Sequence, residues 1–234
     1  MTERISLNNN QLKLIAMFSM LFDHIGFELL PEYNFLRIIG RLAFPIFAYM
    51  ISEGCLYTHN KARYLASISL LAFVCQLVFF VTTGSLYQNV LVTFTLSIVI
   101  IFTIDNFINR KTFFSGFIMS LTLLGTLFIC IGLPYILKSD FDIDYGIIGV
   151  LLPVVIYYAP KKSYKITGCL LMLGLMSYIS GGIQWYSLFT ILLLMLYNGE
   201  RGKLNLKYLF YIFYPIHLAA IYLIQQVFFL TFPN

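Results

Sequence analysis

Long apolar runs separated by short polar turns are the feature that most constrains how this chain of 234 residues can fold. Hydrophobic residues make up 60% of the chain and charged residues only 11%, whereas an average soluble domain has about 25% charged residues. A water-soluble domain of this size cannot cover so much apolar surface, so a soluble enzyme or binding module is excluded. We therefore predict an all-α integral membrane protein, a polytopic bundle of about nine helices in the lipid bilayer.

Each apolar run is predicted to be one transmembrane helix. The nine ranges are 12–30, 36–57, 64–83, 89–108, 113–136, 145–159, 164–180, 184–198 and 207–230. The sixth and the eighth are shorter than the usual span of about 17–25 residues, so eight helices is the alternative. Since no soluble segment, repeat or low-complexity tract separates the runs, residues 1–234 are expected to form a single transmembrane domain.

Lysine and arginine are distributed unevenly between the two sets of loops. Twelve of the fifteen basic residues fall in the N-terminal segment and in every second loop, whereas the opposite loops hold only Lys138, beside Asp140, Asp142 and Asp144. Positive residues remain on the cytoplasmic side, so the N-terminus is expected in the cytoplasm and the C-terminus, after nine spans, outside it. The net charge of +5 thus reflects topology, and we expect no nucleic-acid partner. A multi-pass protein of the cell membrane (inner or plasma membrane), without a cleavable signal peptide, is expected.

Few charged or titratable side chains interrupt the apolar runs, and these are the candidate functional residues. A charge at mid-bilayer costs at least about 2.5–3.5 kcal/mol and usually marks function or a buried pair. The predicted topology places five of these residues, from three different spans, near the middle of the membrane or in its outer half. They are Asp23, His24, Arg37, Arg41 and His217. Glu53 falls about 18 Å of helix rise from Arg41, near the cytoplasmic end of the same span.

Two imidazoles, an acid and arginines suit proton abstraction and group transfer. An imidazole serves as general base toward an amine or hydroxyl, or as a nucleophile that holds an acyl group, and arginine stabilises an oxyanion or binds phosphate. The alternatives are an Asp23–Arg41 ion pair that only joins two helices, a proton-coupled transporter or channel, and a non-catalytic assembly protein. No metal-ligand spacing is present, and the four cysteines are predicted to be small buried hydrophobic residues.

Several short motifs occur in order along nearly the whole chain. They are Asp23-His24-Ile25-Gly26, Gly40-Arg41-Leu42-Ala43-Phe44-Pro45-Ile46-Phe47, Glu53-Gly54 followed by Thr58, Asn60 and Tyr64, Asp144-Tyr145-Gly146, Tyr197-Asn198-Gly199 with Arg201-Gly202, and Tyr214-Pro215-Ile216-His217-Leu218. In this ordered set the chain resembles the TraX family. The resemblance implies a multipass acyltransferase, since the family's namesake acetylates the N-terminal amine of conjugative F pilin in the bacterial inner membrane.

The same resemblance implies acetyl-CoA as the cytoplasmic acyl donor and an acceptor that is a protein N-terminus, a glycan or a lipid. His24 is then the expected general base or acyl carrier, with Asp23 orienting it, His217 as second base or shuttle, and Arg41 stabilising the thioester oxyanion or contacting the pantetheine arm of the donor. The expected donor-binding residues are Arg37, Arg41, Glu53, Asn198 and Arg201, so Arg41 belongs to both sets. Lys203 and Lys207, close to Arg201, are expected to lie near the donor's phosphates.

Overall fold

In a computed structural model, which describes residues 6–203 and 206–231, the chain is helical throughout. The helices are α1 (Asn9–Glu28), α2 (Asn34–Gly40), α3 (Ala43–Tyr57), α4 (Lys61–Thr83), α5 (Val90–Arg110), α6 (Phe113–Leu127), the π-helix η1 (Phe128–Gly132), α7 (Leu133–Leu137), α8 (Gly146–Tyr158), α9 (Lys162–Ser180), the 3₁₀-helix η2 (Gly182–Phe189), α10 (Thr190–Leu196) and α11 (Lys207–Thr231). The described residues contain two isolated β-bridges and no named strand.

Every predicted apolar run coincides with a helix or with consecutive helices. Five of the described segments are long and apolar enough to cross a membrane: Asn34–Tyr57, Lys61–Thr83, Val90–Arg110, Phe113–Leu137 and Leu209–Val227. Two more, Gly146–Tyr158 and Gly182–Leu196, are apolar but shorter. The all-helical membrane fold is therefore confirmed, while the count of nine spans and the cytoplasmic N-terminus stay predictions.

Three of the predicted runs are interrupted where a continuous helix was expected. The run 36–57 breaks at residues 41–42, and α3 begins two residues before Pro45, whose missing N–H and ring disfavour a continuous helix there. The run 113–136 passes through η1 just before Pro134, and the run 184–198 begins as the 3₁₀-helix η2. Pro45 and Pro134 explain the first two of these interruptions, because proline has no backbone N–H to donate to a carbonyl of the preceding turn.

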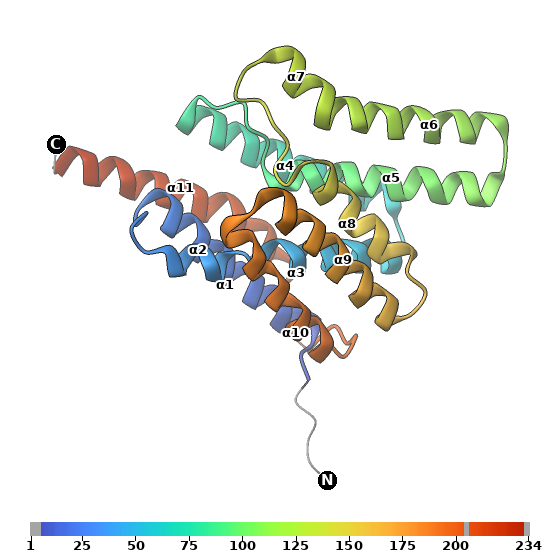
Figure 1. Cartoon of the computed structure of the whole chain (residues 1–234), viewed down its shortest axis with the longest axis horizontal. Helices are drawn as coiled ribbons and strands as arrows, with labels where there is room; N and C mark the ends of the chain where they lie inside the picture. The colour runs from blue at the N-terminus through green and yellow to red at the C-terminus, as the bar shows by residue number, and fades with distance from the viewer. Residues whose placement is uncertain (1–5, 204–205, 232–234) are drawn as a thin grey trace, which may run out of the picture. The chain divides into compact units, whose positions relative to one another are not determined.

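The helices group into two compact units, and the single transmembrane domain stays a prediction. The first comprises Met1–Met50 and Cys169–Asn234, and the second comprises Ile51–Gly168. In the first unit α1 packs against α2 and against α11 (Figure 1). Lys13 contacts Phe210, His24 contacts His217 and Glu28 contacts Gln225, so residue numbers rise together and α1 and α11 run parallel.

In the second unit, α5 packs against α4, α6 and α8 (Figure 1). Loops join these helices at one end: the Asp140 carboxylate accepts the Leu86 N–H at 2.9 Å, and the Tyr87 hydroxyl donates to Asp144 at 3.0 Å. Hydrogen bonds from Ser85 and Leu86 hold the pKa of the exposed Asp140 carboxyl below its usual value. These carboxylates therefore stabilise a turn.

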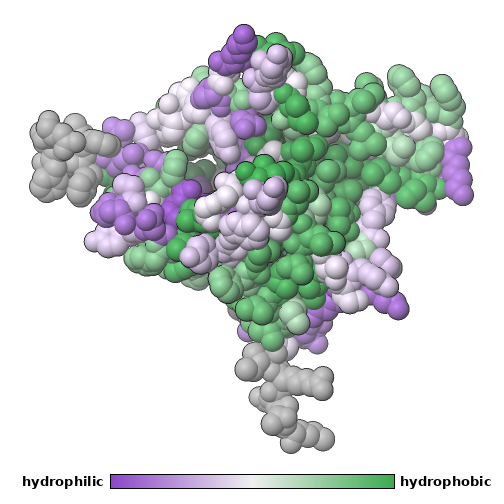
Figure 2. All heavy atoms as spheres, in the orientation of Figure 1, coloured by the Kyte–Doolittle hydropathy of each residue, from purple (hydrophilic) through white to green (hydrophobic). Residues whose placement is uncertain are grey.

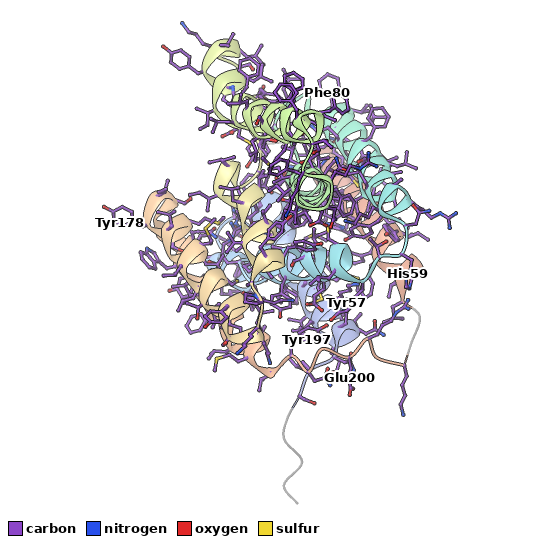
Figure 3. All side chains as sticks on the ribbon, turned by 90° about the vertical axis from the view of Figure 1, so that its right-hand side faces the viewer. Tyr57, His59, Phe80, Tyr178, Tyr197 and Glu200 are labelled. Carbon is purple, nitrogen blue, oxygen red and sulfur yellow. The ribbon has the colours of Figure 1, made fainter. Side chains whose placement is uncertain are left out.

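The surface of α6 is strongly apolar, as expected for a helix that faces lipid. Its exposed side chains include Phe113, Phe114, Phe117, Leu121 and Leu124. Figure 2 shows hydrophobic atoms over the length of α5 and α6, with hydrophilic atoms where α5 turns into α6. Tyr178, which is 79% exposed, likewise projects outward from α9 (Figure 3). Apolar outward-facing surfaces of this kind are stable in hydrocarbon and not in water.

Candidate active site

Asp23 on α1 lies between two arginines of α2 and the turn that follows it. Its Oδ1 is 2.5 Å from Nη2 of Arg41 and 3.5 Å from Nε of Arg37. The side chains are largely buried, with 17% of Asp23, 11% of Arg41 and 22% of Arg37 exposed. Gly40 makes this approach possible, because a Cβ there would overlap the Asp23 carboxylate. One carboxylate thus faces two guanidinium groups, and Glu28 at the end of α1 is close enough to Arg37 for their charges to interact.

Arg41 is held by two further acceptors. Its Nε donates to the Arg37 carbonyl at 3.4 Å, and its Nη1 donates to Oε1 of Gln184 at 3.4 Å. Gln184 lies on η2, 143 residues later in the chain, and is buried. Gln184 was not predicted as a site residue, because a neutral glutamine adds no charge to the predicted span. A polar residue at every third position of this run (Gln184, Ser187, Thr190) is the signal that would have indicated it.

The two histidines within the predicted spans form a pair in the first unit. His24 Nδ1 on α1 and His217 Nε2 on α11 are 3.3 Å apart, and the ring centroids are separated by 5.0 Å. His217 is 4% exposed, and its ring stacks on Phe213 at 4.8 Å. The third histidine, His59, lies exposed in the turn between α3 and α4 of the second unit (Figure 3).

The hydrogen bonds of the pair assign its neutral tautomers. His217 Nδ1 is 2.9 Å from the Phe213 carbonyl, which only accepts, so Nδ1 carries the proton. Nε2 of a neutral His217 is then an acceptor, and the proton between the rings belongs to His24 Nδ1. The lone pair of His24 is consequently on Nε2, the nitrogen that points away from His217. A free imidazole lone pair is what a general base or nucleophile needs.

The structure gives His24 a different partner from the one expected. Asp23, which was expected to orient His24, contacts Arg37 and Arg41, whereas the hydrogen bond of His24 is to His217. Consecutive residues on an α-helix point about 100° apart, since 3.6 residues complete a turn. Asp23 therefore faces α2 and His24 faces α11. Adjacency in the sequence did not correspond to a contact.

Glu53 lies in the second unit and forms a buried ion pair. Its Oε1 is 2.8 Å from Nζ of Lys165, and the two side chains are 7% and 12% exposed. Lys165 is one of the twelve basic residues that the positive-inside pattern assigns to the cytoplasmic side. A carboxylate buried in an ion pair with a lysine can join two helices, in addition to its expected contact with the acyl donor.

Asn198 and Arg201 lie in the loop after α10. This loop is joined to the residues before α1 by three backbone hydrogen bonds: Leu7 N–H to Leu196 O, Asn198 N–H to Leu7 O and Asn9 N–H to Glu200 O. Tyr197 and Glu200 mark this loop beside the start of α1 (Figure 3). The Asn198 amide donates to Glu200 at 3.2 Å, and Arg201 is exposed.

Lys13 is a basic residue near this loop that the sequence did not indicate as a binding residue. Its Nζ lies 5.5 Å from the centre of the Phe210 ring, and it is close enough to Arg201 for the two cations to repel each other. Lys203 is exposed, and the side chain of Lys207 lies outside the described residues. Two cations beside the same loop favour an anion there.

Neither a metal site nor a reactive thiol is evident in the described part of the chain. It contains no group of three or more His, Cys, Asp or Glu residues that could hold a metal ion. Cys55, Cys75, Cys130 and Cys169 are all free and buried, which confirms their prediction as small core residues.

The apolar helices and the buried polar cluster define an all-helical membrane protein with a polar site within the first unit. The model of the TraX family, described as TraX protein, matches residues 8–225. The chain belongs to the TraX family.

Two relatives extend this comparison. The chain is 25% identical over 258 residues to the "Probable fimbrial assembly protein FimC, serogroup H1" of Dichelobacter nodosus, covering 94% of this chain and 97% of that protein. It is 33% identical over 108 residues to the "Uncharacterized protein RP591" of Rickettsia prowazekii (strain Madrid E), covering 45% and 41% of the two chains. No solved structure matches the chain.

Proposed function

We propose that this protein is a membrane-embedded acyltransferase that moves an acetyl group from cytoplasmic acetyl-CoA to an amine or hydroxyl acceptor at or across the membrane. The observation that carries the proposal is the His24–His217 pair, whose hydrogen bonds leave the lone pair on His24 Nε2. It lies in the same unit as the Asp23–Arg37–Arg41 cluster. Membership of the TraX family supports acyl transfer over transport.

In the proposed reaction, His24 Nε2 removes a proton from the acceptor amine or hydroxyl as its nitrogen or oxygen attacks the thioester carbonyl. The new C–N or C–O bond forms, the C–S bond breaks, and the CoA thiolate receives a proton from the His24 imidazolium. While His24 is protonated, its Nδ1–H donates to His217 Nε2 and spreads the positive charge. General-base catalysis of this kind contributes about 10²–10⁴-fold in rate.

Arg41 is the proposed stabiliser of the tetrahedral oxyanion, with Arg37 adding positive charge beside it. Asp23 holds both arginines in place, and the Arg41 guanidinium offers N–H donors and a positive charge to an anion that develops beside it. Removing one donor from an oxyanion site costs about 10²–10³-fold in kcat.

The loop 197–202 and the first two turns of α1 are the proposed contacts of the donor's nucleotide. Lys13 and Arg201 provide two cations for its phosphates, and Asn198 belongs to the same loop. Glu53 is kept as a candidate on the resemblance alone. Because exposed phosphate contacts are screened by salt, each contributes modestly to binding.

Binding of acetyl-CoA to the purified protein in nanodiscs tests the donor. Saturable binding by the wild type, and loss of transfer in His24→Ala with the protein still folded, are expected. His59→Ala is the matched control, because it removes an exposed imidazole outside the site. Near-normal transfer by His24→Ala would refute its role. No binding by folded wild type would refute acetyl-CoA as donor, and liposome flux assays would then test transport.

The first acceptor to test is suggested by a relative of the chain. The relative in Dichelobacter nodosus bears a name that refers to fimbrial assembly, which supports a pilin N-terminal amine as the first acceptor to test. Peptides with a free and with a blocked N-terminus, presented with acetyl-CoA, distinguish an amine acceptor from a hydroxyl. Acetylation of the free peptide alone is expected, and acetylation of a glycan or lipid instead would reassign the acceptor class.

A further inference from the structure

One face of the 3₁₀-helix η2 is lined with buried polar side chains. In a 3₁₀-helix, residues three apart are eclipsed, so Gln184, Ser187 and Thr190 lie on one face. They are 6%, 0% and 0% exposed. The face lies against α2 and the turn after it: Gln184 reaches Arg41, and the Thr190 hydroxyl donates to the Leu42 carbonyl at 3.5 Å. A buried polar face within an apolar segment has a role that lipid packing does not explain.

The amide of Gln184 has a defined orientation. Its Oε1 accepts from Arg41 Nη1, and its Nε2 donates to the sulfur of Met176 at 3.4 Å. The backbone carbonyl of Gln184 accepts the Ser177 hydroxyl at 3.1 Å, which holds η2 against the end of α9. The flipped amide would direct its NH₂ group at the guanidinium, donor against donor, so only one orientation satisfies Arg41.

A neutral acceptor at this position has a specific electrostatic consequence. Arg41 already pairs with the Asp23 carboxylate, and Glu28 lies close enough to Arg37 for their charges to interact. A carboxylate in place of Gln184 would hold Arg41 equally well but would place a second negative charge on the same guanidinium. An amide oxygen fixes the guanidinium and adds no charge.

We propose that Gln184 is a positioning residue that holds the Arg41 guanidinium in its active orientation without placing a second negative charge beside it. This inference rests on the proposed acyl transfer and adds a residue from η2 to the site. Gln184 acts through Arg41, so its replacement should change kcat for acyl transfer and leave the KM for acetyl-CoA almost unchanged. Misplacing a catalytic group by about 1 Å can cost about 10²-fold.

Two variants of Gln184 separate positioning from a structural role. Gln184→Met has a similar shape but no acceptor oxygen, and Gln184→Glu keeps the acceptor but adds a negative charge. We expect both to fold and bind acetyl-CoA like the wild type, with kcat reduced about 10- to 100-fold. A purely structural role predicts the opposite pattern, namely an unstable Gln184→Met and a fully active Gln184→Glu.

Ser187→Ala is the matched control on the same face. The Ser187 hydroxyl is buried and has no hydrogen-bond partner among the described residues, so its removal should leave kcat unchanged. Steady-state kinetics in nanodiscs and thermal unfolding of each variant measure the two effects. Wild-type kcat in Gln184→Met, or full activity in Gln184→Glu with a lowered Tm in Gln184→Met, overturns the inference. A wild type without transfer activity overturns the proposed function, and this inference with it.

Discussion

At the scale of the residue, the protonation of one histidine determines what the other can do. The Phe213 carbonyl, 2.9 Å from His217 Nδ1, assigns the proton to that nitrogen. His217 Nε2 then accepts from His24, and His24 Nε2 keeps its lone pair. A carboxylate performs the same orienting task in many hydrolase triads. Here a neutral imidazole performs it, so the orienting group itself adds no buried charge.

Replacing His217 tests this assignment. His217→Phe keeps a ring to stack on Phe213 but removes the acceptor for His24, so we expect kcat to fall about 100-fold with little change in Tm. His217→Gln supplies an amide oxygen near the position of Nε2 and should restore much of the activity. Steady-state turnover of the two variants in nanodiscs makes the comparison. Wild-type turnover in His217→Phe would show that His24 needs no such partner.

At the scale of the element, glycines allow α1 and α2 to pack closely enough for the ion pairs to form. A Cβ at Gly26 would lie 2.8 Å from Leu36 Cβ, and one at Gly40 would overlap Asp23. Small residues at helix contacts are typical of membrane bundles, where close backbone approach replaces the hydrophobic effect as the source of stability.

Gly40→Ala should therefore disturb both stability and the site. We expect a loss of about 1–3 kcal/mol in the free energy of unfolding, because the Asp23 side chain or the helix must move. Gly174→Ala, on α9, is the control: a Cβ there meets nothing within 4 Å, and alanine is the better helix former. Unfolding in a denaturant series measures both variants. Equal stability of the two would contradict the close α1–α2 packing.

The ion pair between α3 and α9 makes a separate prediction in the second unit. Lys165→Met removes a charged partner from the buried Glu53, and we expect it to cost about 3–5 kcal/mol. The double variant Glu53→Gln with Lys165→Met should recover most of that stability. Its affinity for acetyl-CoA, measured alongside, tests the expected role of Glu53 in donor binding. Unchanged affinity would assign Glu53 a structural role only.

At the scale of the whole molecule, the predicted membrane topology rests on how the basic residues are distributed. In the described part of the chain, five helical segments meet the length and hydropathy of a span, and two shorter apolar segments accompany them. The parallel course of α1 and α11 agrees with a chain in which both run outward from the cytoplasm.

Labelling of single cysteines in intact cells tests this topology. With the native cysteines replaced, we expect Ser139→Cys to react with a membrane-impermeant maleimide from outside, and Lys203→Cys to react only after the cells are opened. Both positions lie in loops of the structure. A cytoplasmic C-terminus, detected by a reporter fusion, would favour eight spans over nine.

Much of the fold was predictable because its causes are local. Each apolar run predicted a helix, and each helix is found, since a backbone in lipid must satisfy its hydrogen bonds within the segment. The breaks before Pro45 and at Pro134 were not predicted, although both prolines are visible in the sequence. The candidate residues Asp23, His24, Arg41 and His217 were selected by their cost in a membrane, and the structure brings all four into one unit.

Sequence alone thus determined the all-helical membrane class and the identity of the polar residues that needed an explanation. The tertiary structure decided which of them are partners. Asp23 and His24 are neighbours in the chain, yet they point about 100° apart and meet different helices. The partner of His24 lies 193 residues away, and Gln184 reaches Arg41 across 143 residues. Such contacts depend on which helices pack together, and no local pattern of residues contains that information.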